Sequence, residues 1–131
     1  MSNSVNALTF VANQQDSAGT NVINRSVGAV SYSGAVGSPV FGSLSDTSEH
    51  QQTFPQGLTT ALQFYFKNTH ASAKITVAWT PTGGSKSTIA VVGPGGVLLL
   101  WSATSAGNVG FTTLYLTSDV AAATFEYFIG G

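Results

Sequence analysis

The sequence contains no cysteine and has few charged side chains. Asp, Glu, Lys and Arg make up 7% of its 131 residues, against roughly 25% in an average soluble domain. The absence of cysteine excludes disulfides, thiolate catalysis and cysteine-based zinc sites. With so few charges, the polar surface must consist mainly of serine, threonine, asparagine, glutamine and glycine. Such a surface is better suited to lying against other protein than to diffusing alone.

The sequence also lacks the patterns that bind nucleic acid or enter membranes. Its basic residues Arg25, Lys67, Lys74 and Lys86 are scattered singly, too few to neutralise a phosphate backbone. The longest apolar stretch, Val97–Trp101, is far shorter than the roughly 20 residues that span a bilayer. The first residues show neither the basic nor the apolar region of a signal peptide. We therefore expect a soluble protein made without export, with no nucleic-acid or membrane partner.

A chain of this length can bury a core without metal or disulfides, and we expect one domain over residues 1–131. Its two parts differ in composition. Residues 1–60 are rich in Ser, Gly, Asn and Gln, with short apolar islands. Residues 61–131 form a dense series of short segments with apolar alternation, separated by turn residues. The second part therefore supplies most of the predicted core.

Period-two alternation predicts strands in the second part. Leu62, Phe64 and Phe66 share one face of the first strand, and Trp79 falls in register with the core positions of the next. Pro94 and Gly95 suit the centre of a type II turn, and a second turn is expected over residues 81–84. The strands predicted here cover residues 61–68, 74–80, 87–92, 97–101, 111–116 and 123–129.

The first part gives weaker strand patterns, at residues 7–12, 27–32 and 39–44, and residues 46–56 are predicted to form a long polar loop. No segment shows the 3.6-residue period of a helix over three turns. The predicted fold is all-β: an antiparallel β-sandwich or jelly roll of about eight strands, with long loops in the N-terminal half. A small closed barrel is the alternative.

One predicted strand is apolar on both faces, so it is either central in a sandwich or covered on its outer side by a neighbouring subunit. Together with the outward-facing Tyr65, it provides the candidate interface. Tyr65 and Trp101 are also the candidates for stacking against a sugar ring, in the alternative that the chain recognises a glycan. The candidate interface residues are Val97, Leu98, Leu99, Leu100, Trp101 and Tyr65.

Catalytic patterns are weak. Asp46, Glu49 and His50 lie in one polar segment and could ligate a metal or form a general-base pair, but their spacing matches no established metal motif. His70 falls in a predicted turn, where histidine is usually a surface residue. There is no Gly-x-Ser-x-Gly elbow and no phosphate-binding glycine loop. We expect no catalytic residue, no metal and no cofactor, and therefore not an enzyme.

Three segments of the second part carry a resemblance to known proteins. They are residues 62–68 (LQFYFKN), 75–80 (ITVAWT) and 93–101 (GPGGVLLLW). Their order of strand, Lys-Asn turn, strand, glycine-proline turn and strand resembles that of small β-sandwich virion proteins of tailed bacteriophages. The charge-poor, cysteine-free composition is similar too. The resemblance covers about residues 61–131, and the first half has no matching pattern.

The resemblance implies a structural component of the virion, assembled in the host cytoplasm. It implies capsid or other virion proteins as partners and a homo-oligomer, with a trimer favoured. A capsid decoration protein that stabilises the head lattice is the leading interpretation, and a tail or fibre adaptor is the alternative within the same class. Residues 14–60 are then the candidate for an arm or bridging loop over neighbouring subunits.

Overall fold

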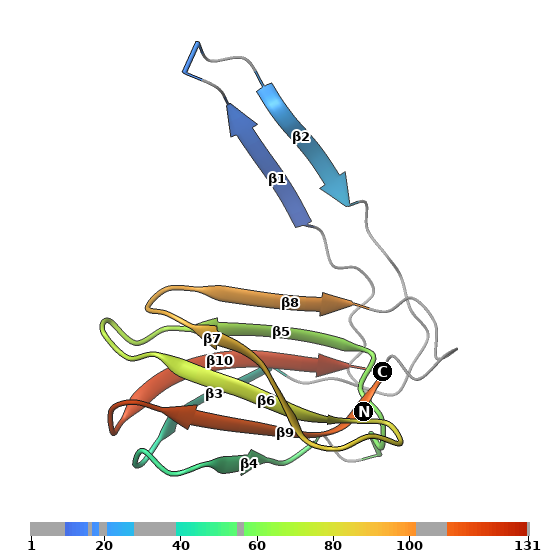
Figure 1. Cartoon of the computed structure of the whole chain (residues 1–131), viewed down its shortest axis with the longest axis vertical. Coiled ribbons are helices and arrows are strands. Elements are labelled where there is room, and N and C mark those ends of the chain that lie inside the picture. The colour runs from blue at the N-terminus through green and yellow to red at the C-terminus, as the bar shows by residue number, and fades with distance from the viewer. Residues whose placement is uncertain are drawn as a thin grey trace.

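The computed structural model describes residues 10–15, 17–18, 21–27, 39–54, 57–101 and 110–130. The described residues form strands and no helix, which confirms the predicted all-β class (Figure 1). The strands are β1 (Phe10–Gln15), β2 (Asn21–Val27), β3 (Pro39–Leu44), β4 (His50–Gln52), β5 (Gln63–Asn68), β6 (Ile75–Pro81), β7 (Ser87–Val92), β8 (Val97–Trp101), β9 (Phe111–Ser118) and β10 (Ala123–Gly130).

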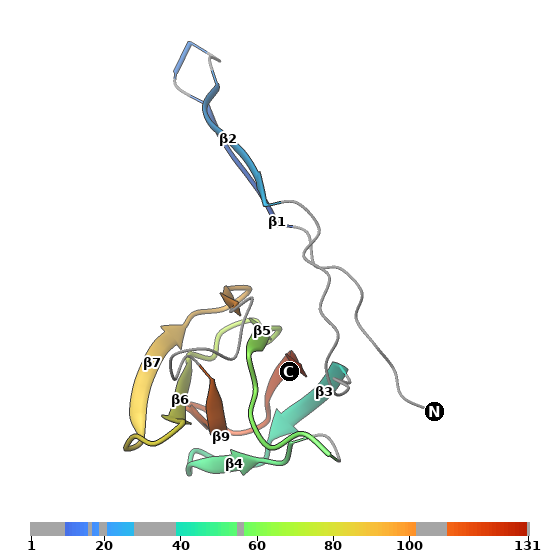
Figure 2. The same ribbon diagram turned by 90° about the vertical axis from the view of Figure 1, so that its right-hand side faces the viewer.

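Eight strands, β3 to β10, form two four-stranded antiparallel sheets. The first sheet has the order β3-β10-β5-β8 and the second the order β4-β9-β6-β7. Figure 2 shows β7, β6, β9 and β4 on one side of the sandwich and β8, β5 and β3 on the other. The expected β-sandwich is therefore confirmed, because these strands make two sheets and no closed barrel.

The pairing of the eight strands is nested. The first pairs with the last, the second with the seventh, the third with the sixth and the fourth with the fifth: β3 with β10, β4 with β9, β5 with β8 and β6 with β7. A long antiparallel ribbon rolled into two sheets has this order, which is the jelly-roll arrangement. It places strands from opposite ends of the sandwich sequence, such as β3 and β10, side by side.

The remaining strands, β1 and β2, pair with each other as an antiparallel hairpin and form a separate two-stranded sheet (Figure 1). The predicted strand at residues 7–12 overlaps β1 at residues 10–12, and β1 continues beyond it to Gln15. Residues 7–9 lie outside the described part. The predicted strand at residues 27–32 overlaps β2 only at Val27, and its other residues lie outside the described part. β2 itself was not predicted.

The core lies between the two sheets and is built from the apolar face of each alternating strand. Phe111, the first residue of β9, packs against three other rings, with ring centroids 5.6 Å from Phe54, 5.6 Å from Phe64 and 5.1 Å from Trp79. Trp79 packs against the buried cluster, as predicted. The other large side chains buried here include Phe64, Phe66, Ile75, Val77, Leu114, Leu116, Phe125, Tyr127 and Ile129.

The predicted turns form as their residues require. Gly95 has a positive φ of 70°, and the N–H of Gly96 donates to the carbonyl of Gly93 at 2.9 Å. A type II turn needs a positive φ at this position, which glycine adopts without a Cβ clash. Gly83 has a φ of 74°, with a hydrogen bond of 3.0 Å from Gly84 N–H to Pro81 C=O. These turns connect β7 to β8 and β6 to β7.

Asn68, the last residue of β5, is fully buried and ties three segments together. Its side-chain Nδ2 donates to the carbonyls of Ala73 at 2.7 Å and Val92 at 2.9 Å. Its Oδ1 accepts from the N–H of His70 at 3.0 Å. One amide therefore satisfies backbone groups of both the β5–β6 turn and the end of β7.

The first half of the chain contributes more to the sandwich than its sequence indicates. β3 forms at the predicted residues 39–44. The predicted loop at residues 46–56 is wrong in part, because β4 forms within it by pairing with β9. Of the proposed arm over residues 14–60, residues 39–44 and 50–52 are strands of the sandwich.

In the described part, no helix is long and apolar enough to cross a membrane.

Candidate functional site

The first sheet presents an apolar and aromatic outer face, which we call the outer face. Strand register places its residues in two rows that run across the sheet. Leu99, Tyr65 and Phe128 are direct neighbours in one row. The next row contains Val97, Lys67, Glu126 and Phe41. Residues opposite one another in a ladder point to the same side of the sheet, so all seven positions share this face.

The apolar side chains of the outer face are substantially exposed. Phe41 is 74% exposed and Val97 is 55% exposed. Leu99, Tyr65 and Phe128 are partly exposed, and none of the five belongs to the buried core cluster. A contiguous exposed apolar patch on a small domain marks an interaction site, whereas single exposed hydrophobic residues do not.

The side of the second sheet that points away from the core has a different chemistry, because hydroxyl groups make up most of it. Register aligns Thr76 with Thr117, and Thr80 with Thr113, on the side away from the core. Val91, 61% exposed, is the one large exposed hydrophobic residue there in the described part. Threonine suits a strand surface in contact with water, because its β-branch packs and its hydroxyl stays solvated. The two faces of the sandwich therefore differ in chemistry, and the first is the candidate functional site.

The predicted interface strand has two different sides. Leu98 and Leu100 pack against the core, whereas Val97 and Leu99 lie on the outer face. In the described part β8 is an edge strand of the first sheet, and only one of its two sides faces the core. The backbone of Trp101 pairs with Gln63. The side chain of Trp101 lies outside the described part, so its predicted interface and glycan contacts stay predictions.

Tyr65 carries the main polar contact of the outer face. Its hydroxyl donates to the Glu126 carboxylate at 2.9 Å across the β5–β10 pair. Burial raises the pKa of Tyr65, and the hydrogen bond to Glu126 and the charge of Glu126 raise it further. This bond ties the phenol hydroxyl to the neighbouring strand, and strand register places Tyr65 between Leu99 and Phe128 on the outer face.

We expect the free energy of unfolding to fall above about pH 10. The pKa of Tyr127 is raised by burial, and that of Tyr65 is raised as described. The unfolded chain then loses its phenolic protons first, so the native state binds more protons and stability falls as pH rises. Urea unfolding between pH 8 and 11 tests this. The decline should be shallower for Tyr127→Phe, and constant stability of the wild type over this range contradicts the expectation.

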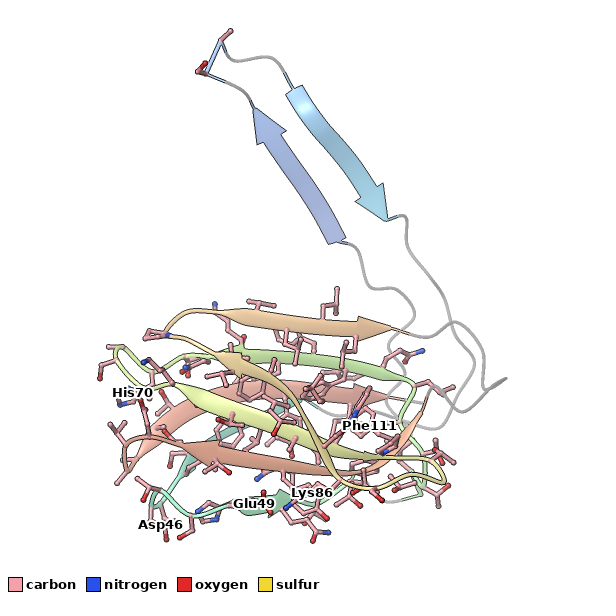
Figure 3. All side chains as sticks on the ribbon, viewed as in Figure 1. Asp46, Glu49, His70, Lys86 and Phe111 are labelled. Carbon is pink, nitrogen blue, oxygen red and sulfur yellow. The ribbon has the colours of Figure 1, made fainter. Side chains whose placement is uncertain are left out.

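In the polar segment, Asp46 and His50 lie in contact, whereas Glu49 lies beside Lys86 (Figure 3). Asp46 Oδ1 accepts from Ser48 N–H at 2.7 Å and lies 2.9 Å from His50 Nε2. Hydrogen bonds from the Ser48 backbone and side chain, and then from His50, lower the pKa of Asp46. Glu49 instead pairs with Lys86 at 2.7 Å. These contacts shape the turn before β4.

Lys86 extends over the outer side of the second sheet (Figure 3). Its Nζ lies 4.9 Å from the centre of the Tyr115 ring on β9 and pairs with Glu49. Among the described residues, no group of three or more His, Cys, Asp or Glu side chains could hold a metal ion. His70 lies in the β5–β6 turn, where its Nδ1 accepts from the N–H groups of Ser72 at 3.2 Å and Ala73 at 3.0 Å.

Sequence reasoning found Tyr65, Val97 and Leu99 but missed Phe41, Phe128 and Glu126. In β10, Phe128 alternates with Phe125, Tyr127 and Ile129 and therefore lies on the other face of the strand, so the sequence did contain a signal for it. No local sequence signal marks Phe41, because its exposure depends on β3 lying beside β10. Comparison with known proteins gives no identification: no family model, no curated protein and no solved structure matches the chain.

Proposed function

We propose that this chain is a non-enzymatic structural protein of a bacteriophage particle, most specifically a decoration protein that binds the capsid lattice. The observation that carries the proposal is the outer face of the first sheet. It exposes Phe41 and Val97 beside partly exposed Leu99, Tyr65 and Phe128. The sequence resemblance to small phage virion proteins supplies the class of particle.

The mechanism is burial of the outer face on lattice protein. Covering a large side chain such as Phe41 stabilises a complex by about 1.5–3 kcal/mol. The face contains one basic and one acidic side chain, Lys67 and Glu126, which are direct cross-strand neighbours. Docking it therefore removes no net charge from water. Many copies on one particle add modest contacts into firm attachment.

The threonine-rich outer side of the second sheet then faces solvent on the assembled particle. Its hydroxyls and the Lys86–Glu49 pair keep that side hydrated. A protein that stayed a free monomer would gain nothing from exposing one apolar side to water. The asymmetry of the sandwich is therefore accounted for by attachment through one sheet.

The proposal is tested on particles of the phage that encodes the chain. Purified by density gradient, they should contain the chain in many copies, and gold-labelled antibody should decorate their heads. Labelling confined to the tail would replace decoration with the adaptor role. Absence of the chain from purified particles would overturn a virion role altogether.

We expect Phe41→Glu to weaken binding to particles made without the chain by at least about thirtyfold, because it removes apolar burial and adds an unpaired charge. The matched control is Val91→Glu, at an exposed hydrophobic position on the second sheet (61% exposed, against 74% for Phe41). It should bind as wild type does. Co-sedimentation of each purified variant with particles measures the difference, and equal loss in both variants contradicts docking through the outer face.

The glycan-recognition alternative predicts a different pattern. Sugar stacking would depend on the Tyr65 ring, so Tyr65→Ala should abolish binding to a glycan array and Phe41→Glu should leave it unchanged. Docking on lattice protein predicts no array signal for the wild type. The array and the particle assay thus separate the two functions.

A further inference from the structure

β8 is an edge strand with a free side. It pairs with β5 on one side, and no strand in the described part of the chain pairs with the other. The free side therefore presents backbone N–H and C=O groups that a further strand could bind. This edge is distinct from the outer face, because it is defined by the backbone of β8 and lies in the plane of the sheet.

The hydrogen bonds of β5 show which groups of β8 point outward. Asn68 N–H donates to Gly96 C=O at 3.0 Å, and Thr69 N–H donates to Thr124 C=O at 3.1 Å. Backbone groups alternate between the two sides of a strand. Even-numbered residues of β5 therefore bond toward β8, and odd-numbered residues toward β10. By the same register, Leu98 and Leu100 bond to β5, whereas Val97, Leu99 and Trp101 direct their backbone groups to the free side.

The other three edge strands of the sandwich carry features that discourage strand addition, and β8 carries none of them. β3 begins with Pro39, and β4 has three residues. β7 follows Lys86 and has a register shift in its pairing with β6. β8 has no proline, no charge and regular pairing along its length. Natural sheets protect edges of this kind unless a partner covers them.

We infer that the free edge of β8 pairs with β8 of a second copy of this chain, across a two-fold axis perpendicular to the sheet. Antiparallel pairing centred on Leu99 brings Leu99 opposite its own symmetry mate and Val97 opposite the mate of Trp101. All three residues point their backbone groups to the free side, so this register forms about six hydrogen bonds. The result is one continuous eight-stranded sheet in a dimer, which would replace the trimer implied by the sequence resemblance.

Three observations favour a second copy over another occupant. The free backbone groups lie at positions 97, 99 and 101, and this spacing is the same when the strand is read in the opposite direction. Two antiparallel copies can therefore pair through the same residues, as an isologous contact requires. The net charge of −1 opposes self-association only weakly. Val97 and Leu99 also extend the outer face to this edge, so the two-fold joins two outer faces into one surface. The inference does not require the particle role, although it would double the area that docks.

Sedimentation equilibrium of the full chain and of Leu99→Pro tests the inference. Proline at position 99 removes an N–H that points away from β5, so the sandwich keeps all its own hydrogen bonds. In the dimer it removes both central hydrogen bonds. The wild type should be a dimer, and Leu99→Pro should raise its dissociation constant by at least about a hundredfold. Leu99→Thr keeps the N–H and should stay within about tenfold of wild type.

Phe41→Glu serves as a second control, because it alters the outer face on the opposite edge strand and should not change dimerisation. Hydrogen exchange provides a measurement that needs no variant. The Leu99 amide should be protected in the dimer and become exchangeable on dilution. A monomeric wild type, a trimer, a dimer that survives Leu99→Pro, or an unprotected Leu99 amide would each overturn the inference. Dimerisation without particle binding would leave it standing and reject the proposed function.

Discussion

Asn68→Asp is expected to destabilise the sandwich by about 3 kcal/mol or more at pH 7. The substitution keeps the shape of the side chain but places an oxygen where Nδ2 donates to the carbonyls of Ala73 and Val92. Because Asn68 is fully buried, neither carbonyl can turn to water without opening a turn. A charged carboxylate at this place would also lose its own hydration.

The loss should be smaller at acidic pH. A protonated carboxyl can donate to one of the two carbonyls, so urea unfolding of Asn68→Asp at pH 4 should recover part of the stability lost at pH 7. Gln51→Glu makes the same chemical change on the exposed side of β4 and should cost less than about 0.5 kcal/mol. An Asn68→Asp protein within about 1 kcal/mol of wild type would show that the two side-chain bonds contribute little.

Local chemistry explains why the second half of the sequence predicts its structure well. Alternation in β5, β6 and β10 fixes which side chains face the core, since the period of a strand is two. Pro94 and Gly95 fix the turn before β8 because their allowed φ values match it. These signals act between residues a few positions apart, so a single sequence contains all of them.

The arrangement of the strands could not be predicted in this way. Phe41, Tyr65, Val97 and Phe128 gather on one face only because the jelly roll places β3 beside β10 and β8 beside β5. No local pattern encodes these distant pairings. β4 illustrates the same limit: its three residues His50–Gln52 are polar, and they form a strand because the edge of β9 offers hydrogen-bond partners. Tertiary context overrides weak strand propensity there.

The low charge content of the sequence has a spatial counterpart in the structure. In the described part, the Asp46–His50 hydrogen bond and the Lys86–Glu49 ion pair both lie next to the second sheet. The first sheet has only Lys67 and Glu126 on its outer face, and Glu126 is engaged by Tyr65. Hydration is thus concentrated on one side, which agrees with a protein that docks through the other.

Phe111→Ala and Phe41→Ala are expected to give opposite results, although both remove a phenyl ring from a strand. Phe111 is 2% exposed and packs among the rings of Phe54, Phe64 and Trp79. Its removal leaves a cavity among these rings and should cost about 3–5 kcal/mol. Phe41 is 74% exposed, and its removal should change the free energy of unfolding by less than about 0.5 kcal/mol.

In an assay of particle binding, the order of the two variants should be reversed, with Phe41→Ala the more impaired. Below its unfolding temperature, Phe111→Ala retains an intact outer face and should bind particles as wild type does, because the cavity lies between the sheets. Phe41→Ala should remain fully folded in urea titrations and bind at least about tenfold more weakly, since one exposed ring no longer becomes buried. If Phe41→Ala bound normally, the exposure of that ring would have no functional meaning. If Phe41→Ala unfolded the protein, the Phe41 ring would have a structural role and would not belong to the docking surface.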